Sequence, residues 1–199
     1  MLRWPLLLML AVLLPMQPAA LPDGPSYTSD GQLKYPGEYA EWVFLGAGLD
    51  MSYTSDAEMV MGSMFNSVYV NPSAYRAFKQ TGHWPEGTEM VLENRGATGA
   101  SSINKRGKTE SSEVMGMEIH VKDSARHKGD GWAFYGFGQP GDRTSTGRLI
   151  TRPAACYTCH EAHAAVDTTF TQFYPNALNI AKEKGTLSPE YLKESAPAK

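Results

Sequence analysis

The pentapeptide Cys156-Tyr157-Thr158-Cys159-His160 constrains this chain more than any other feature of its sequence. The C-x-x-C-H spacing is typical of covalent attachment of haem c. On one helical turn, thiols three residues apart lie on the same side, and each can add to a vinyl group of the haem. The adjacent histidine then supplies a nitrogen to the iron. We therefore predict one covalently bound haem c per chain, attached at Cys156 and Cys159, with His160 as the proximal ligand.

Three other uses of these cysteines, the only two in the chain, are open at this point. A redox dithiol of the thioredoxin kind requires a βαβ setting, and the surrounding sequence lacks that pattern. A disulfide between the two cysteines would close a very small, strained loop. A zinc site would combine them with His163 and one further histidine. Haem attachment is the interpretation that the spacing favours.

Residues 1–20 have the features of a secretory signal peptide. Arg3 gives a positive start, residues 6–14 are uniformly apolar, and alanines at 19 and 20 suit a cleavage site. The apolar run is shorter than the roughly 20 residues of a membrane-spanning helix. A retained N-terminal anchor is the alternative. We predict cleavage, export to the periplasm, and no membrane span in the mature chain.

Length and composition indicate a single globular domain. The chain has 199 residues, of which 42% are hydrophobic and 20% charged. Lysine and arginine number 18 against 21 aspartates and glutamates, for a net charge of -3, which argues against a nucleic-acid partner. We expect an N-terminal arm over residues 21–33, rich in Pro, Gly, Ser and Asp, followed by one haem c domain over 34–199.

Periodicity and turn residues predict an α+β fold: a mainly antiparallel sheet with flanking helices, and a haem-binding helix near the C-terminus. Strands are expected over 65–70, 88–94, 113–121 and 131–137. Helices are expected from Pro36 to about Gly46 or Gly48, and over 72–81, 154–163 and 171–184. The polar stretch 96–112 reads as a hairpin connection and 138–153 as a loop, whereas 51–64 has no clear pattern.

The sequence after the haem motif resembles the cytochrome P-460 and cytochrome c′-beta family, through His163, Asp167, Phe170 and the run Gln172-Phe173-Tyr174-Pro175. The resemblance covers roughly residues 33–184. It implies a mostly antiparallel β fold, a homodimer, and a five-coordinate iron bound by His160 with an open distal face. Further matching blocks are Tyr39-Ala40-Glu41-Trp42-Val43, Val68-Tyr69-Val70-Asn71-Pro72 with Tyr75, Lys79 and Thr81-Gly82, Val121-Lys122-Asp123-Ser124, and Trp132-Ala133-Phe134-Tyr135.

The same resemblance bears on activity. In the hydroxylamine-oxidising enzymes of the family, a lysine bonds covalently to the haem edge and a distal carboxylate acts as a base. Aligned from Thr81, the lysine position holds Leu92, and residues 143–155, where we place the carboxylate, contain neither Asp nor Glu. Both departures imply the branch without a crosslink, with an apolar distal pocket that binds nitric oxide or related small ligands.

Other residues keep the enzyme alternative open. A lysine–haem crosslink from elsewhere, or a different base, would restore hydroxylamine oxidation. As single residues, these candidates are more often solvated charges. The candidates for the crosslink are Lys79, Lys105 and Lys108, and those for the base are Asp142, His120 and Glu113.

A third possibility is a six-coordinate electron-transfer cytochrome with a periplasmic redox partner. Its second axial ligand would be His120 or a methionine from the cluster Met59, Met61 and Met64, although methionine at such spacing is usually core filler. We expect His163 to hydrogen-bond a haem propionate or a carbonyl. Candidates for the distal wall are Phe65, Tyr69, Leu92, Trp132 and Phe134, and candidates for propionate contacts are Arg148 and Arg152, with sheet core and surface charge as the alternatives.

Overall fold

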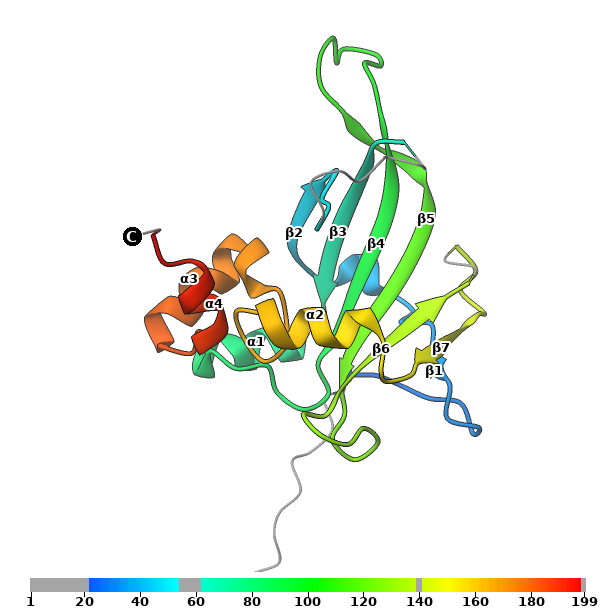
Figure 1. The fold of residues 1–199 in the computed structure, drawn as a ribbon. Helices are drawn as coiled ribbons and strands as arrows, with labels where there is room; N and C mark the ends of the chain where they lie inside the picture. Colours follow the sequence, from blue (N-terminus) through cyan, green and yellow to red (C-terminus); the bar gives the residue numbers. More distant parts are fainter. Residues whose placement is uncertain (1–21, 54–61, 139–140, 198–199) are drawn as a thin grey trace, which may run out of the picture.

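The computed structural model describes residues 22–53, 62–138 and 141–197, in which the chain forms one seven-stranded sheet. Every neighbouring pair of strands is antiparallel, which confirms the predicted α+β class (Figure 1). The signal peptide and the methionines Met59 and Met61 lie outside the described residues. In the order β1-β7-β6-β5-β4-β3-β2, the sheet consists of β1 (Leu33–Lys34), β7 (Thr146–Ile150), β6 (Trp132–Phe137), β5 (Thr109–Lys122), β4 (Glu89–Thr98), β3 (Met64–Val70) and β2 (Val43–Leu49).

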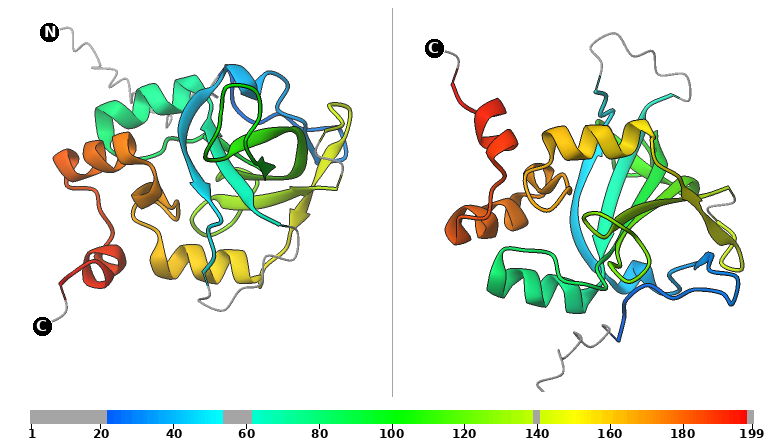
Figure 2. Two further views of the ribbon diagram at one scale, coloured as in Figure 1. Left: turned by 90° about the horizontal axis from the view of Figure 1, so that it is seen from above. Right: turned by 60° about the horizontal axis from the view of Figure 1, so that its bottom comes forward.

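The four α-helices of the described residues gather on one side of the sheet, which can be followed from two further directions in Figure 2. None of the helices in the described part of the chain has the length and apolar composition needed to cross a membrane. The helices are α1 (Pro72–Thr81), α2 (Ala155–His163), α3 (Pro175–Lys184) and α4 (Pro189–Glu194), with short 3-10 helices η1 (Tyr39–Glu41) and η2 (Thr171–Phe173).

Side chains alternate along the strands, so the sheet has two buried faces. On the face toward the helices, Val70 and Met90 pack in one cluster with Phe78 of α1. On the opposite face, Ile119 packs in a second cluster with Leu33, which is fully buried at the end of the predicted arm. The N-terminal segment therefore covers one face and the helices cover the other.

Helix α1 begins and ends where the sequence predicts. Pro72 occupies the first turn after Asn71, and Gly82 ends the helix with φ +75°. A left-handed residue at this position is most often glycine, because it has no Cβ to clash with the backbone. The backbone N–H of Gly82 donates to the carbonyl of Phe78 at 2.7 Å.

The prediction of a helix from Pro36 to about Gly46 or Gly48 is wrong. Only Tyr39–Glu41 is helical, as a 3-10 turn, and Val43–Leu49 forms the edge strand β2 paired with β3. Apolar residues at 39, 42, 43 and 45 fit one helical face, but pairing with a neighbouring strand outweighs local periodicity. Gly46 allows this strand to lie against η2, since a Cβ there would stand 3.2 Å from the carbonyl oxygen of Phe173.

Two connections contain more structure than expected. Strands β4 and β5 extend to Thr98 and from Thr109, so both ends of the predicted 96–112 connection are strand, and the hairpin projects from the sheet in Figure 1. The predicted loop 138–153 contains β7, which pairs with both β6 and β1. The other expected strands and the helix bearing the cysteines are confirmed, with shifted ends.

Candidate cofactor site

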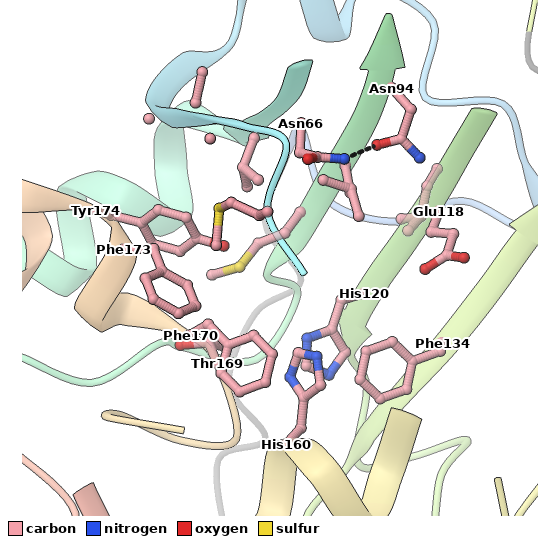
Figure 3. A pocket seen from close by; sticks show the side chains of 18 of the residues that line it. Asn66, Asn94, Glu118, His120, Phe134, His160, Thr169, Phe170, Phe173 and Tyr174 are labelled. Atoms are coloured by element: carbon pink, nitrogen blue, oxygen red, sulfur yellow. Dashed lines mark hydrogen bonds between the residues drawn. The ribbon is translucent and has the colours of Figure 1, made fainter. Parts of the chain in front are cut away.

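A cavity lies on the helical face of the sheet, next to the end of α2 that carries His160 (Figure 3). Its volume is about 220 Å³, somewhat below the ~300–1,000 Å³ typical of small-molecule sites, and it is partly open to solvent. It is lined by Gly46, Ala47, Gly48, Met51, Tyr53, Asn66, Val68, Met90, Leu92, Asn94, Glu118, Ile119, His120, Phe134, His160, Thr169, Phe170, Phe173 and Tyr174.

Helix α2 is fixed to the sheet by Tyr157, the residue after the first cysteine. Its hydroxyl donates to the carbonyl of Ile150 at 2.8 Å and accepts from the backbone N–H of Phe134 at 3.3 Å. The Tyr157 ring is buried and meets the Phe134 ring edge to face. These contacts join α2 to β6 and β7, so the position of the following cysteine and histidine is set by the sheet.

The imidazole of His160 is oriented for binding a metal through one nitrogen. Its Nδ1 lies 2.8 Å from the carbonyl oxygen of Thr168, and only a protonated Nδ1 can donate there. In the neutral ring this leaves the lone pair on Nε2. Phe170 stacks on the ring, with centroids 3.9 Å apart. Burial lowers the pKa of His160, although its bond to Thr168 opposes that shift.

The two cysteines are free thiols, and both are partly buried. They stand three residues apart on α2, on the same side of the helix. Tyr53 and Glu118 line the cavity and neither cysteine does, but Cys159 lies close enough to Tyr53 to raise its pKa, after the larger effect of burial. A haem linked through both thiols and bound by Nε2 of His160 therefore fits the residues present.

His120 lies beside His160 and is the second histidine at this end of the cavity. The centroids of the two imidazoles are 5.2 Å apart, and the His120 ring stacks on Phe134 at 4.0 Å. Burial lowers the pKa of His120 well below its usual range, and the nearby His160 and Arg152 lower it further, so the ring is neutral. Its Nε2 has no hydrogen-bond partner among the described residues.

The opposite end of the cavity is polar, a feature that no pattern in the sequence indicated. The side-chain amide of Asn66 donates to Oδ1 of Asn94 at 2.7 Å, and Glu118 points into the same region (Figure 3). Glu118 and His120 are two residues apart on β5 and share a face. That alternation was visible in the sequence, but the pairing of Glu118 opposite Leu92 required the register of β4 and β5.

The structure divides the predicted distal-wall residues. Leu92 and Phe134 line the cavity. Trp132 is on the same face, next to His120 with centroids 4.4 Å apart, but outside the lining. Phe65 and Tyr69 alternate with the cavity-lining residues of β3 and so face the other side of the sheet.

Of the two arginines expected at the haem propionates, one pairs with carboxylates and the other is exposed. Arg152 forms ion pairs with Asp130, at 3.2 Å, and with Glu161. Arg148 is exposed on β7, and neither arginine lines the cavity. Nδ1 of His163 donates to the carboxylate of Glu194 at 3.1 Å, so it links α2 to α4.

The candidates for a crosslink or a base are also placed by the structure. Within the described part of the chain, no lysine lines the cavity. Lys79 lies over the Tyr75 ring on α1, and Lys105 and Lys108 are exposed near the hairpin tip. Among the candidate bases, only His120 lines the cavity; Glu113 and Asp142 line a second hollow with Tyr39.

Nothing in the described residues brings three or more His, Cys, Asp and Glu side chains together as a metal cluster. Met64, the described member of the methionine cluster, begins β3 and is not in the lining of the cavity. Two methionines outside that cluster, Met51 and Met90, do line it.

A family model described as cytochrome P460 matches residues 36–171, which is more than half of the chain. The matched region contains every strand from β2 onward, the haem-binding motif and the turn that holds His160. No curated protein matches the chain.

Proposed function

Because this chain belongs to the cytochrome P460 family, whose members carry c-type haem, we propose that Cys156 and Cys159 hold one covalent haem per chain. His160 ligates the iron through Nε2, and the iron is five-coordinate. The haem supplies an iron site that binds small ligands and changes oxidation state by one electron. The primary function is the binding or handling of nitric oxide or a related small ligand.

Leu92 is the observation that carries this proposal. In the alignment from Thr81, it occupies the position at which the hydroxylamine-oxidising members of the family have a crosslinking lysine. It also lines the cavity. A leucine cannot form a covalent bond to the haem edge. Together with Val68 and Met90, it makes an apolar wall that favours a neutral diatomic over an anion.

Glu118 favours a second candidate function, the oxidation of hydroxylamine. A carboxylate in the cavity is a possible base for a bound N–H substrate, and Glu118 forms no hydrogen bond or ion pair to another described residue. It replaces Asp142 and Glu113 as the candidate for that role, because those two residues lie outside the cavity. The two candidate functions therefore differ in whether this carboxylate takes a proton from substrate.

The absorption spectrum of the ferrous protein is the first test. A broad high-spin band at the usual haem c position, followed by stoichiometric nitric oxide binding, supports the primary function. A Soret band far to the red would reveal a crosslink and favour the enzyme. Sharp low-spin α and β bands would reveal a sixth ligand, such as His120, and favour electron transfer.

Glu118→Gln separates the two candidates further, with Glu113→Gln on the same strand as its matched control. Hydroxylamine oxidation that is lost in the Glu118 variant and kept in the Glu113 variant would establish the enzyme. If both variants bind nitric oxide like the wild type and none oxidises hydroxylamine, the binding function stands.

Export, assembly and partners belong to the same proposal. We expect cleavage near residue 20 and a periplasmic holoprotein, which the mass of the purified mature chain and cell fractionation would check. We expect a homodimer, to be measured by sedimentation of the holoprotein. One-electron chemistry also requires a periplasmic redox partner, detectable by the rate at which a periplasmic extract reduces the haem.

A further inference from the structure

A four-residue turn after α2 carries the carbonyl that binds the ring of His160. Val166 and Thr169 bridge across it, and the N–H of Thr169 donates to the carbonyl of Val166 at 2.8 Å. Between them, Asp167 and Thr168 have φ of +47° and +57°. Positive φ at both central positions is the pattern of a type I′ turn, which glycine, asparagine and aspartate favour. Asp167 suits such a turn, but a β-branched residue such as Thr168 rarely takes a positive φ, so the surroundings must hold this turn.

The carboxylate of Asp167 is held at both oxygens by the segment that follows α1. Nδ1 of His83 donates to Oδ1 at 2.9 Å, and the backbone N–H of Trp84 donates to Oδ2 at 2.7 Å. The Asp167 side chain is 19% exposed, so these bonds are partly shielded from water. Asp167 thus connects the turn to a loop that is more than eighty residues away in sequence.

That loop is itself firmly placed. The indole of Trp84 is buried and stacks on Phe78 of α1, with ring centroids 3.9 Å apart. Its Nε1 donates to Oγ1 of Thr169 at 3.0 Å and to that of Thr171 at 3.3 Å. The loop therefore holds the turn by hydrogen bonds to two residues, Asp167 and Thr169, which flank Thr168.

We propose that Asp167 is a positioning residue for the proximal ligand: held by His83 and Trp84, it fixes the Thr168 carbonyl and so sets the hydrogen bond on Nδ1 of His160. This inference rests on the proposed ligation of a haem by His160. A firm bond at Nδ1 makes the imidazole a stronger donor to iron and favours the ferric state. Loosening the turn weakens that bond and raises the reduction potential.

The test uses the holoprotein and three variants, two of Asp167 and one of His83. Asp167→Ala removes the carboxylate and also disfavours the turn. Asp167→Gly removes the carboxylate but keeps the backbone freedom that the turn needs. His83→Ala removes one of the two donors. For each, the midpoint potential and the iron–histidine stretching band of the ferrous protein are measured. We expect the potential to rise and the band to shift to lower frequency, most in Asp167→Ala and least in His83→Ala.

His163→Ala is the matched control. His163 also pairs with a carboxylate and has a similar exposure, 52% against 56% for His83, but its partner Glu194 belongs to α4. The potential and the stretching band should stay at their wild-type values in this variant. If Asp167→Ala does not mature with haem, Asp167→Gly and His83→Ala decide the outcome.

Two results would overturn the proposal: wild-type values of both measurements in Asp167→Gly and His83→Ala, or an equal shift in His163→Ala. Failure of the proposed function is distinguishable from this. A wild-type protein without a histidine-ligated haem would lack the iron–histidine stretching band, and this would contradict the proposed function. A wild type that shows the band, with variants that leave it unchanged, would contradict the role of Asp167 alone.

Discussion

At the scale of single residues, Glu89 at the start of β4 is the carboxylate most at odds with its surroundings. It is 2% exposed, and its Oε1 has no hydrogen-bond partner among the described residues. Burial, and next the charge of Asp23, raise the pKa of Glu89 to about 8. The folded protein therefore holds a proton on this carboxyl at neutral pH, while the unfolded chain releases it near pH 4.5.

This difference predicts how stability depends on pH. Between about pH 4.5 and 8 the folded state binds more protons than the unfolded state, so the free energy of unfolding falls as pH rises. At 1.36 kcal/mol per pH unit, the loss between pH 4.5 and 7 is on the order of 3 kcal/mol. Urea unfolding of the wild type and Glu89→Gln at several pH values measures it: the neutral glutamine should remove most of this slope, and Glu183→Gln, at an exposed site on α3, should not.

Residues of the site differ in how far sequence alone could place them. Cys156, Cys159 and His160 lie within a single pentapeptide, so their spacing alone was enough to predict a haem-attachment site. Glu118 was missed because its place opposite Leu92 depends on the register of two strands. The bond from His160 to Thr168 depends on two left-handed residues that no pattern indicated.

At the scale of elements, helix and strand predictions failed where local pattern and sheet pairing disagree. Helix α1 has Asn71 just before it, a first-turn proline and a terminal glycine, all read from neighbouring residues. Strand β2 has only apolar positions that also fit a helix, and its pairing with β3 decides its structure. Strand β7 lies among Gly, Thr and Arg residues, which are typical of loops, and exists because β6 and β1 flank it.

Trp84 allows the link between the loop after α1 and the turn region to be measured. Trp84→Phe keeps an aromatic ring against Phe78 but leaves the hydroxyls of Thr169 and Thr171 without the indole donor. We expect a loss of about 1–3 kcal/mol in the free energy of unfolding, determined by urea denaturation.

The control for this loss is Trp132→Phe. Trp132 is similarly buried, at 3% exposure, and within the described residues its indole N–H donates no hydrogen bond. The Trp132→Phe variant should therefore lose only the packing free energy that follows from replacing the indole with a smaller ring. Equal losses in the two variants would mean that the indole bonds of Trp84 contribute nothing beyond packing.

At the scale of the whole molecule, the sheet separates two hydrophobic cores, one on each of its faces. The cluster on the helical face, with Val68, Met90 and the helices, borders the cavity. The cluster on the far face, with Val91, Ile119 and Tyr135, packs against the N-terminal segment. Because a haem would fill only the first side, the two faces should respond differently when it is missing.

Hydrogen exchange of the double variant Cys156→Ala/Cys159→Ala, which cannot attach haem, measures this difference. Without the haem, α2 and the turn at 166–169 lose the contacts that a filled cavity would provide, so their amides should exchange at least tenfold faster, a change of about 1.4 kcal/mol. The backbone amides that join β5 to β6 should stay protected, because Ile119 and Tyr135, which are paired there, point into the far core. Loss of protection throughout the sheet would instead show that the haem stabilises the entire domain, and that the far core cannot hold the strands by itself.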